Sequence, residues 1–213
     1  MKIKKLFFIT LLIFISLTCL FACTKKDERE LDEKPVIYLY PQEKTNVSIK
    51  IKYEGEIFVS YPKYNDGWEV TAYPDGTIIN STDNEEYSYL FWEGKSNTNY
   101  DTSFGFVIKG EDTEQFLKEK LKFIGLNSKE YNEFIVYWLP KMINNPYNLI
   151  TFQQDAYTDS TILHINPKPD SILRVFMTFK PLTHKIEIIP QNLEPFTREG
   201  FTVVEWGGSE ILK

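Results

Sequence analysis

Four acidic residues have the setting that glycoside hydrolysis requires, because each lies beside an aromatic residue or at the end of an expected strand: Glu93, Asp101, Asp155 and Glu205. Two carboxyl groups across a sugar-sized gap are enough to cleave a glycosidic bond. Glu93 and Glu205 are the main catalytic candidates, since Glu205 shares an expected strand face with Phe201 and Val203. The alternative for Glu205 is a solvated strand end or a bond to the backbone, because a chain with 30 acidic residues produces such neighbours easily.

Other catalytic signals are missing from the sequence. A hydrolytic triad needs a base, and the two histidines are His164 and His184. His164 shares a strand face with Ile162 and is expected to be half-buried, whereas His184 is expected in a solvated turn. No G-x-S-x-G, P-loop or G-x-G-x-x-G motif occurs, and no His-acid spacing typical of zinc is present. We therefore favour a non-catalytic protein and expect neither a metal nor another cofactor.

Aromatic residues give a stronger indication of binding than the acids give of catalysis. Four rings lie near Asn, Asp, Glu or Gly at expected turns and are the candidate ligand-binding residues: Tyr64, Trp68, Trp92 and Trp206. An exposed ring at such a place could stack on the apolar face of a sugar. The alternative is that each ring fills the core, which is where most of the aromatic residues of a β-rich domain must lie.

The N-terminus is typical of a secretory signal. Lysines within the first five residues precede an uncharged apolar run at 6–22. The run ends in Leu20-Phe21-Ala22-Cys23, which resembles the lipobox of bacterial lipoproteins. The resemblance implies cleavage before Cys23, acylation of its sulfur and attachment to the cell membrane or outer membrane on the extracytoplasmic side. The alternative is an uncleaved membrane anchor, because 17 apolar positions are at the lower limit for spanning a bilayer.

Cleavage after residue 22 changes the charge and the cysteine content. The remaining chain has 21 basic and 30 acidic side chains, a net charge of −9, which argues against nucleic acid as a partner. Cys19 leaves with residues 1–22, and acylation occupies Cys23. No thiol is then left for a disulfide or for cysteine catalysis.

Residues 23–34 are almost wholly charged, which predicts a solvated tether. Within them, Lys26-Asp27-Glu28 resembles the surface-export signal of lipoproteins in some bacteria, and an ordinary charged tether is the alternative. We expect one extracytoplasmic domain at 35–213.

Alternating apolar residues and turn signals predict strands on both sides of a helical segment. The expected strands are 35–41, 47–53, 57–61, 68–73, 77–79, 87–92, 104–108, 149–152, 162–165, 173–179, 186–189 and 201–206. The class is therefore α+β, mainly antiparallel β and sandwich-like, with an inserted two-helix hairpin at about 112–145.

The two helices have recognisable ends. Asp112 and Gln115 are spaced like a capping box, and Gly125 provides a stop. The second helix is expected to begin after Asn127 or Ser128, and Pro140 is expected to kink or end it.

Three strings, KPVIYLYP at 34–41, YSYLFWEG at 87–94 and GFTVVEWGG at 200–208, are similar to a group of bacterial extracytoplasmic proteins with no established activity. That resemblance supplies no substrate and no catalytic residue. Together with the lipobox it favours a membrane-anchored, non-catalytic binding or envelope-associated module. Its expected partners are membrane lipid at Cys23 and a cell-wall glycan, an exported polysaccharide or a protein. A carboxylate-dependent glycan hydrolase is the alternative.

Overall fold

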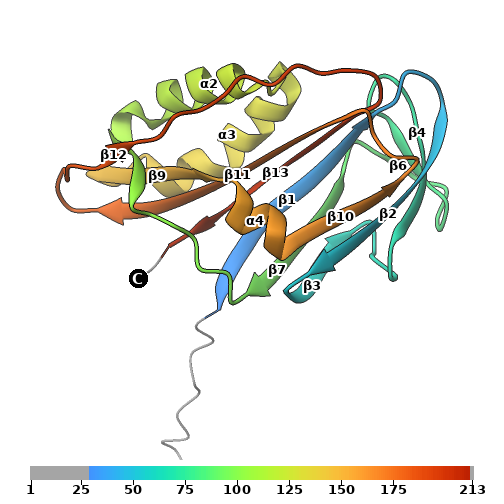
Figure 1. Ribbon diagram of the computed structural model, residues 1–213, viewed down its shortest axis with the longest axis horizontal. Coiled ribbons are helices and arrows are strands. Elements are labelled where there is room, and N and C mark those ends of the chain that lie inside the picture. The colour runs from blue at the N-terminus through green and yellow to red at the C-terminus, as the bar shows by residue number, and fades with distance from the viewer. Residues whose placement is uncertain (1–28, 212–213) are drawn as a thin grey trace, which may run out of the picture.

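The computed structural model describes residues 29–211 as two β-sheets and a layer of helices (Figure 1). The larger sheet has the order β12 (Ile189–Pro190), β8 (Phe104–Lys109), β9 (Tyr147–Gln153), β11 (Ser171–Leu182), β13 (Thr202–Glu210), β1 (Glu30–Tyr40), β7 (Leu90–Ser96), β3 (Gly55–Tyr61). The smaller sheet has the order β10 (Thr161–Asn166), β2 (Thr45–Tyr53), β4 (Trp68–Ala72), β5 (Ile78–Asn80), β6 (Glu86–Tyr87). The neighbouring strands are antiparallel except for the pairs β11–β13 and β8–β12, so the prediction of a mainly antiparallel β protein is confirmed.

Two helices, α2 (Thr113–Ile124) and α3 (Ser128–Met142), lie between β8 and β9 in the chain and cover one face of the larger sheet (Figure 1). Their buried side chains, including Leu117 and Trp138, share a core with Val204 and Trp206 of β13. The predicted helix pair is confirmed. No helix within residues 29–211 is long and apolar enough to cross a bilayer.

The expected start of each helix and the expected stop of the first helix are confirmed. Asn127 caps α3 in a capping box with Glu130, and Gly125 ends α2 in the left-handed region at φ 115°. Asp112 occupies the N-cap position of α2 as predicted, but the predicted capping box is wrong, because the 3-10 turn η1 (Gly110–Asp112) leads directly into α2 and the Asp112 side chain makes no capping bond. Pro140 lies within α3, which continues for two further residues.

The other face of the larger sheet is covered in two parts. Towards β3, a core that includes Ile37 and Trp92 of the larger sheet packs against Ile49 and Trp68 of the smaller sheet. The rest is covered by the β7–β8 loop, residues 97–103, and by α4 (Asp155–Ser160), a helix that the sequence pattern did not predict. The ring of Tyr157 in α4 stacks on Phe176 of β11 at 4.0 Å between centroids, and Tyr100 of the loop lies 5.1 Å from the same ring.

The predicted tether is too long at its C-terminal end. Residues 30–34 belong to β1, where Leu31 pairs with Lys95 and Asp32 with Gly94 of β7. Asp32 is fully buried, and its carboxylate accepts hydrogen bonds from two tyrosines, so its charge does not keep it in solvent. The folded domain therefore begins before residue 35. Cys23 and the export-signal triplet lie outside the described residues.

Candidate functional site

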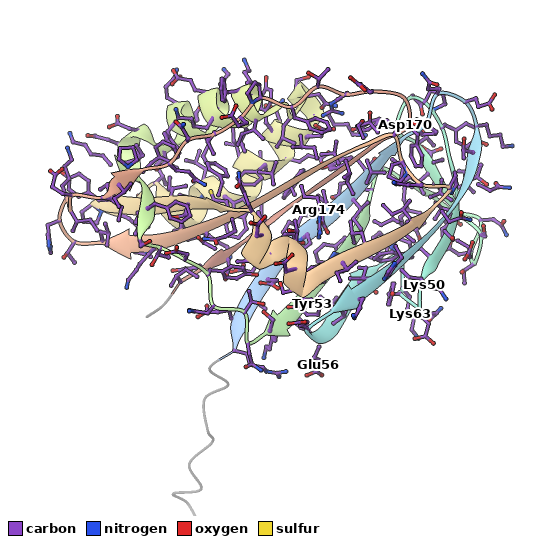
Figure 2. The ribbon with its side chains drawn as sticks, viewed as in Figure 1. Lys50, Tyr53, Glu56, Lys63, Asp170 and Arg174 are labelled. Carbon is purple, nitrogen blue, oxygen red and sulfur yellow. The ribbon has the colours of Figure 1, made fainter. Side chains whose placement is uncertain are left out.

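Glu205, the first catalytic candidate, is part of a buried ion pair. Its Oε2 accepts a hydrogen bond from Nε of Arg174 at 2.6 Å, and Arg174 Nη1 donates to the carbonyl of Thr161 at 2.6 Å. The guanidinium of Arg174 also lies over the ring of Tyr157, beside α4 (Figure 2). The Glu205 side chain is 0% exposed. A carboxylate in this position supports the fold and has no access to a polymeric substrate.

Glu93, the second candidate, lies on the opposite face of the sheet from Glu205. Because side chains alternate along a strand, Glu93 points away from the inter-sheet core that contains Trp92, whereas Glu205 is on the same face as Val203 of that core. The Glu93 carboxylate accepts a hydrogen bond from the Lys34 amide at 3.2 Å, and burial raises its pKa. These two acids cannot flank one sugar ring.

The three candidate tryptophans are core residues. Trp68, Trp92 and Trp206 are at most 1% exposed, so the prediction that they present rings to a ligand is wrong. The pleat of each strand turns these side chains into a core although turns lie nearby. Tyr64 is half-buried; its ring packs against Trp68 at 4.8 Å, and its hydroxyl accepts a hydrogen bond from the Ile51 amide.

Both histidines are exposed. His164 is on the outer face of β10 with Ile162 rather than half-buried, because that face points to solvent. His184 is exposed after β11, as expected. Within residues 29–211, no three His, Cys, Asp or Glu side chains are grouped to hold a metal ion.

The structure brings together the other two acids, Asp101 and Asp155. Both are exposed, and both line a pocket of about 560 Å³, here called the acid pocket, between the β7–β8 loop, the end of β9 and β12. One carboxylate oxygen of Asp101 accepts a hydrogen bond from the Ser103 amide at 2.8 Å, which lowers the pKa of Asp101. Polar and apolar groups complete the pocket, among them Phe104, Gln154, Ile189 and Asn192.

The β7–β8 loop is almost fully extended. Its ends are five strand positions apart in the larger sheet, which corresponds to about 24 Å at the usual strand spacing. The eight residue steps from Ser96 to Phe104 reach about 26–29 Å when extended. In the second half of the loop, successive side chains point to opposite sides, so Tyr100 and Thr102 line one pocket while Asp101 and Ser103 line the acid pocket.

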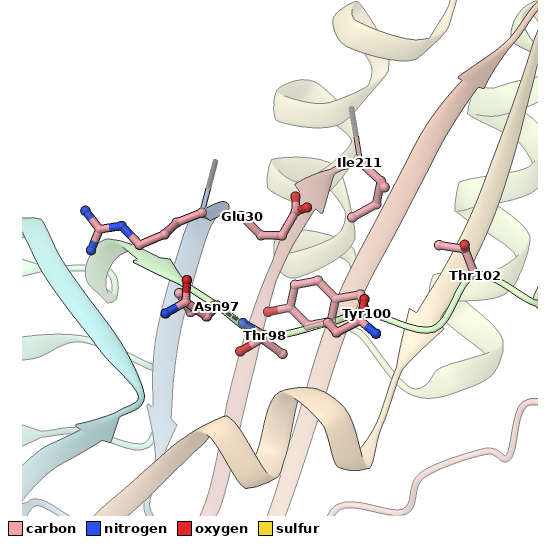
Figure 3. A pocket seen from close by; sticks show the side chains of 9 residues that line it. Glu30, Asn97, Thr98, Tyr100, Thr102 and Ile211 are labelled. Atoms are coloured by element: carbon pink, nitrogen blue, oxygen red, sulfur yellow. Dashed lines mark hydrogen bonds between the residues drawn. The ribbon is translucent and has the colours of Figure 1, made fainter. Parts of the chain in front are cut away.

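The first of these two pockets, here called the terminal pocket, has a volume of about 480 Å³ and lies between the start of β1 and the end of β13 (Figure 3). Its lining is rich in amide and hydroxyl groups and contains one acid and one base: Arg29, Glu30, Ser96, Asn97, Thr98, Asn99, Tyr100, Thr102 and Ile211. Such groups donate and accept hydrogen bonds in the way that sugar hydroxyls require.

Hydrogen bonds attach the loop and the start of β8 to neighbouring strands. Gln153 Nε2 donates to the Asp101 carbonyl at 2.8 Å, Thr151 Oγ1 donates to the Phe104 carbonyl at 2.8 Å, and the Tyr100 hydroxyl donates to Asp32 Oδ1 at 2.7 Å. These bonds hold Tyr100, Asp101 and Phe104, while Asn97 and Asn99 remain exposed. A loop fixed in this way loses little conformational entropy when its side chains bind a ligand.

Asp32 of β1 holds the loop through the hydrogen bond that it accepts from the Tyr100 hydroxyl. Burial raises the pKa of Asp32 to about 6, although the hydroxyls of Tyr53 and Tyr100 act to lower it. The sequence pattern indicated Asp101 and Asp155 as candidate site residues. It did not indicate the side-chain amides of Asn97 and Asn99 or the carboxylate of Asp32. The polar run Ser96-Asn97-Thr98-Asn99 was the available signal.

Part of this chain is similar to a known bacterial protein. A protein from Butyrivibrio fibrisolvens, described as "Uncharacterized protein in bglA 3'region", is 47% identical over 66 residues, which is 30% of this chain and 67% of that protein. No family model and no solved structure matches the chain.

Proposed function

The chain belongs to the family of that Butyrivibrio fibrisolvens protein, and we propose that it is a lipid-anchored, extracytoplasmic module that binds a cell-wall glycan or an exported polysaccharide. The lipobox at Cys23 supports the anchor, and the β7–β8 loop supports the binding role. As part of this proposal, the fold is a sandwich-like α+β domain with an inserted helical hairpin.

The observation that carries the binding role is a loop that is hydrogen-bonded to neighbouring strands, has exposed polar side chains and lies between two pockets. The Asp101 carbonyl of the loop is bonded to β9 and the Tyr100 hydroxyl is bonded to β1, while Asn97, Asn99 and Asp101 remain exposed. The two pockets, of about 480 and 560 Å³, are within the range of about 300–1,000 Å³ that is usual for small-molecule sites. Several neutral hydrogen-bonding groups beside apolar surface suit a sugar better than a nucleotide or a metal ion.

A retention assay tests this function. The three core clusters are formed by residues after 29, so a chain of residues 29–213 contains the whole core. We expect purified cell walls or members of a glycan panel to retain this chain, and the double variant Asn97→Ala/Asn99→Ala to lower retention at least tenfold. Asn132→Ala, an exposed change of the same kind on α3, is the control and should leave retention unchanged. Equal retention of the parent and the double variant would contradict the proposed site.

A carboxylate-dependent glycan hydrolase is the second candidate function. The specific observation in its favour is that Asp101 and Asp155 line the same pocket. If the protein is a hydrolase, Asp101→Asn or Asp155→Asn will abolish the release of reducing ends and leave binding intact. Asp159→Asn, an exposed change on α4 outside the pocket lining, is the matched control. Retention without any release of reducing ends would leave the binding module as the function.

A further inference from the structure

We infer that the terminal pocket faces the membrane and binds the neutral sugar headgroup of a membrane glycolipid. This inference rests on the proposed lipid anchor and glycan-binding role. It adds that the glycan is the headgroup of a lipid in the membrane. It follows from three features: the length of chain between Cys23 and the pocket, the distance to the far end of β1, and the charge of the pocket lining.

The anchor restricts the terminal pocket to the region close to the bilayer. Arg29 lines the pocket and follows Cys23 by six residues. Six residue steps cannot span more than about 22 Å even when fully extended. An acylated Cys23 lies at the membrane surface, so the rim of the terminal pocket must lie within that distance of it.

The end of the domain at Tyr40, the last residue of β1, cannot be the side that is held at the membrane surface. β1 runs for 11 residues from Glu30 to Tyr40, which corresponds to about 33 Å at the usual rise per residue of a strand. This length exceeds the reach of the chain from Cys23. Ile211, directly after β13, lines the terminal pocket together with Glu30 at the start of β1 (Figure 3). These ends of two central strands therefore mark the membrane-proximal side.

The pocket lining selects a neutral headgroup. Arg29 and Glu30 contribute one charge of each sign, and the other polar groups are amides and hydroxyls. The chain after Cys23 carries a net charge of −9, so an anionic headgroup would be repelled by the domain as a whole. Sugar hydroxyls can bond to the exposed amides of Asn97 and Asn99, and Ile211 provides an apolar surface for the ring.

Vesicle co-sedimentation tests the ligand. The chain of residues 29–213 is mixed with phosphatidylcholine vesicles that contain or lack glucosyl diacylglycerol. We expect at least tenfold more bound protein on the glycolipid vesicles, loss of this difference in Asn97→Ala/Asn99→Ala, and an unchanged difference in Asn132→Ala. Equal binding to both kinds of vesicle would overturn the inference. If free oligosaccharides still bind, the proposed function survives; if walls, glycans and vesicles all fail to bind, both are wrong.

Fluorescence quenching tests the orientation with the full lipidated chain. A fluorophore is attached at Asn99→Cys, beside the terminal pocket, or at Val136→Cys, which is 75% exposed on α3 over the other face of the sheet. The chain is reconstituted in vesicles whose headgroups carry a nitroxide quencher. We expect quenching at position 99 to be several-fold stronger than at position 136. Equal quenching, or stronger quenching at position 136, would overturn the membrane-facing placement whatever ligand binds.

Discussion

Asp32 couples the stability of the domain to pH. Burial raises the pKa of Asp32 to about 6. The folded protein therefore holds this proton more tightly than the unfolded chain, whose Asp pKa is about 3.9. The resulting stabilisation is fully present below about pH 4 and is lost as pH rises through about 6.

Replacing Asp32 with Asn should remove this pH dependence. The amide stays neutral, so the free energy of unfolding of Asp32→Asn relative to the parent should rise by about 2–3 kcal/mol between pH 4 and pH 7. Urea unfolding at several pH values measures the difference. Asp159→Asn, at an exposed position, should give a curve parallel to that of the parent. A parallel curve for Asp32→Asn as well would show that Asp32 does not titrate in this range.

The ion pair of Glu205 and Arg174 should show the cost of an unpaired buried charge. Glu205→Gln leaves the guanidinium without its partner and should destabilise the fold by about 3–5 kcal/mol. The double change Glu205→Gln/Arg174→Met should cost less than the sum of the two single changes, because it removes both charges. Denaturant unfolding of all four proteins gives the coupling energy, and additive costs would contradict a direct interaction.

Elements with a strong local pattern could be predicted from the sequence, and those held by distant contacts could not. The helix pair and the turn-flanked strands were anticipated from periodicity and from caps such as Asn127 and Gly125. The expected strand at 186–189 is reduced to Ile189–Pro190, which forms one edge of the larger sheet and pairs with β8. The helix α4 was missed because six residues, held by the stacking of Tyr157 on Phe176, provide too short a periodic pattern.

The N-cap residues of α2 and α3 can be compared directly in a stability test. Asn127→Ala removes a side chain that accepts a hydrogen bond from the Glu130 amide at 3.1 Å and should destabilise the protein by about 1 kcal/mol. Asp112→Ala removes a side chain that makes no capping bond and should change stability by less than about 0.5 kcal/mol. Thermal or urea unfolding compares the two variants. Equal losses would contradict the assignment of the caps.

For the whole molecule, strand order determines the candidate site, and strand order was not readable from local pattern. β7 and β8 are consecutive in the chain, yet β1, β13, β11 and β9 lie between them in the sheet. The insertion of these four strands extends the loop and places its residues between two pockets. The tryptophans were misjudged for a related reason, because strands buried on both faces do not show which face a ring occupies.

The proposed membrane attachment through Cys23 would determine how the whole molecule is oriented, and it can be tested independently of any ligand. Cys19 and Cys23 are four residues apart, but only Cys23 follows an aliphatic residue at −3, Leu20, because Ser16 stands at that position before Cys19. Cys23→Ser should abolish incorporation of labelled palmitate and leave the chain at its uncleaved mass. Cys19→Ser should keep both labelling and cleavage. A lipobox directs acylation to one cysteine sulfur, that of Cys23. If the apolar run were instead an uncleaved anchor, both variants would stay in the membrane without palmitate label. Labelling that survives in Cys23→Ser would contradict the lipobox assignment, and with it the short connection that holds the terminal pocket close to the bilayer.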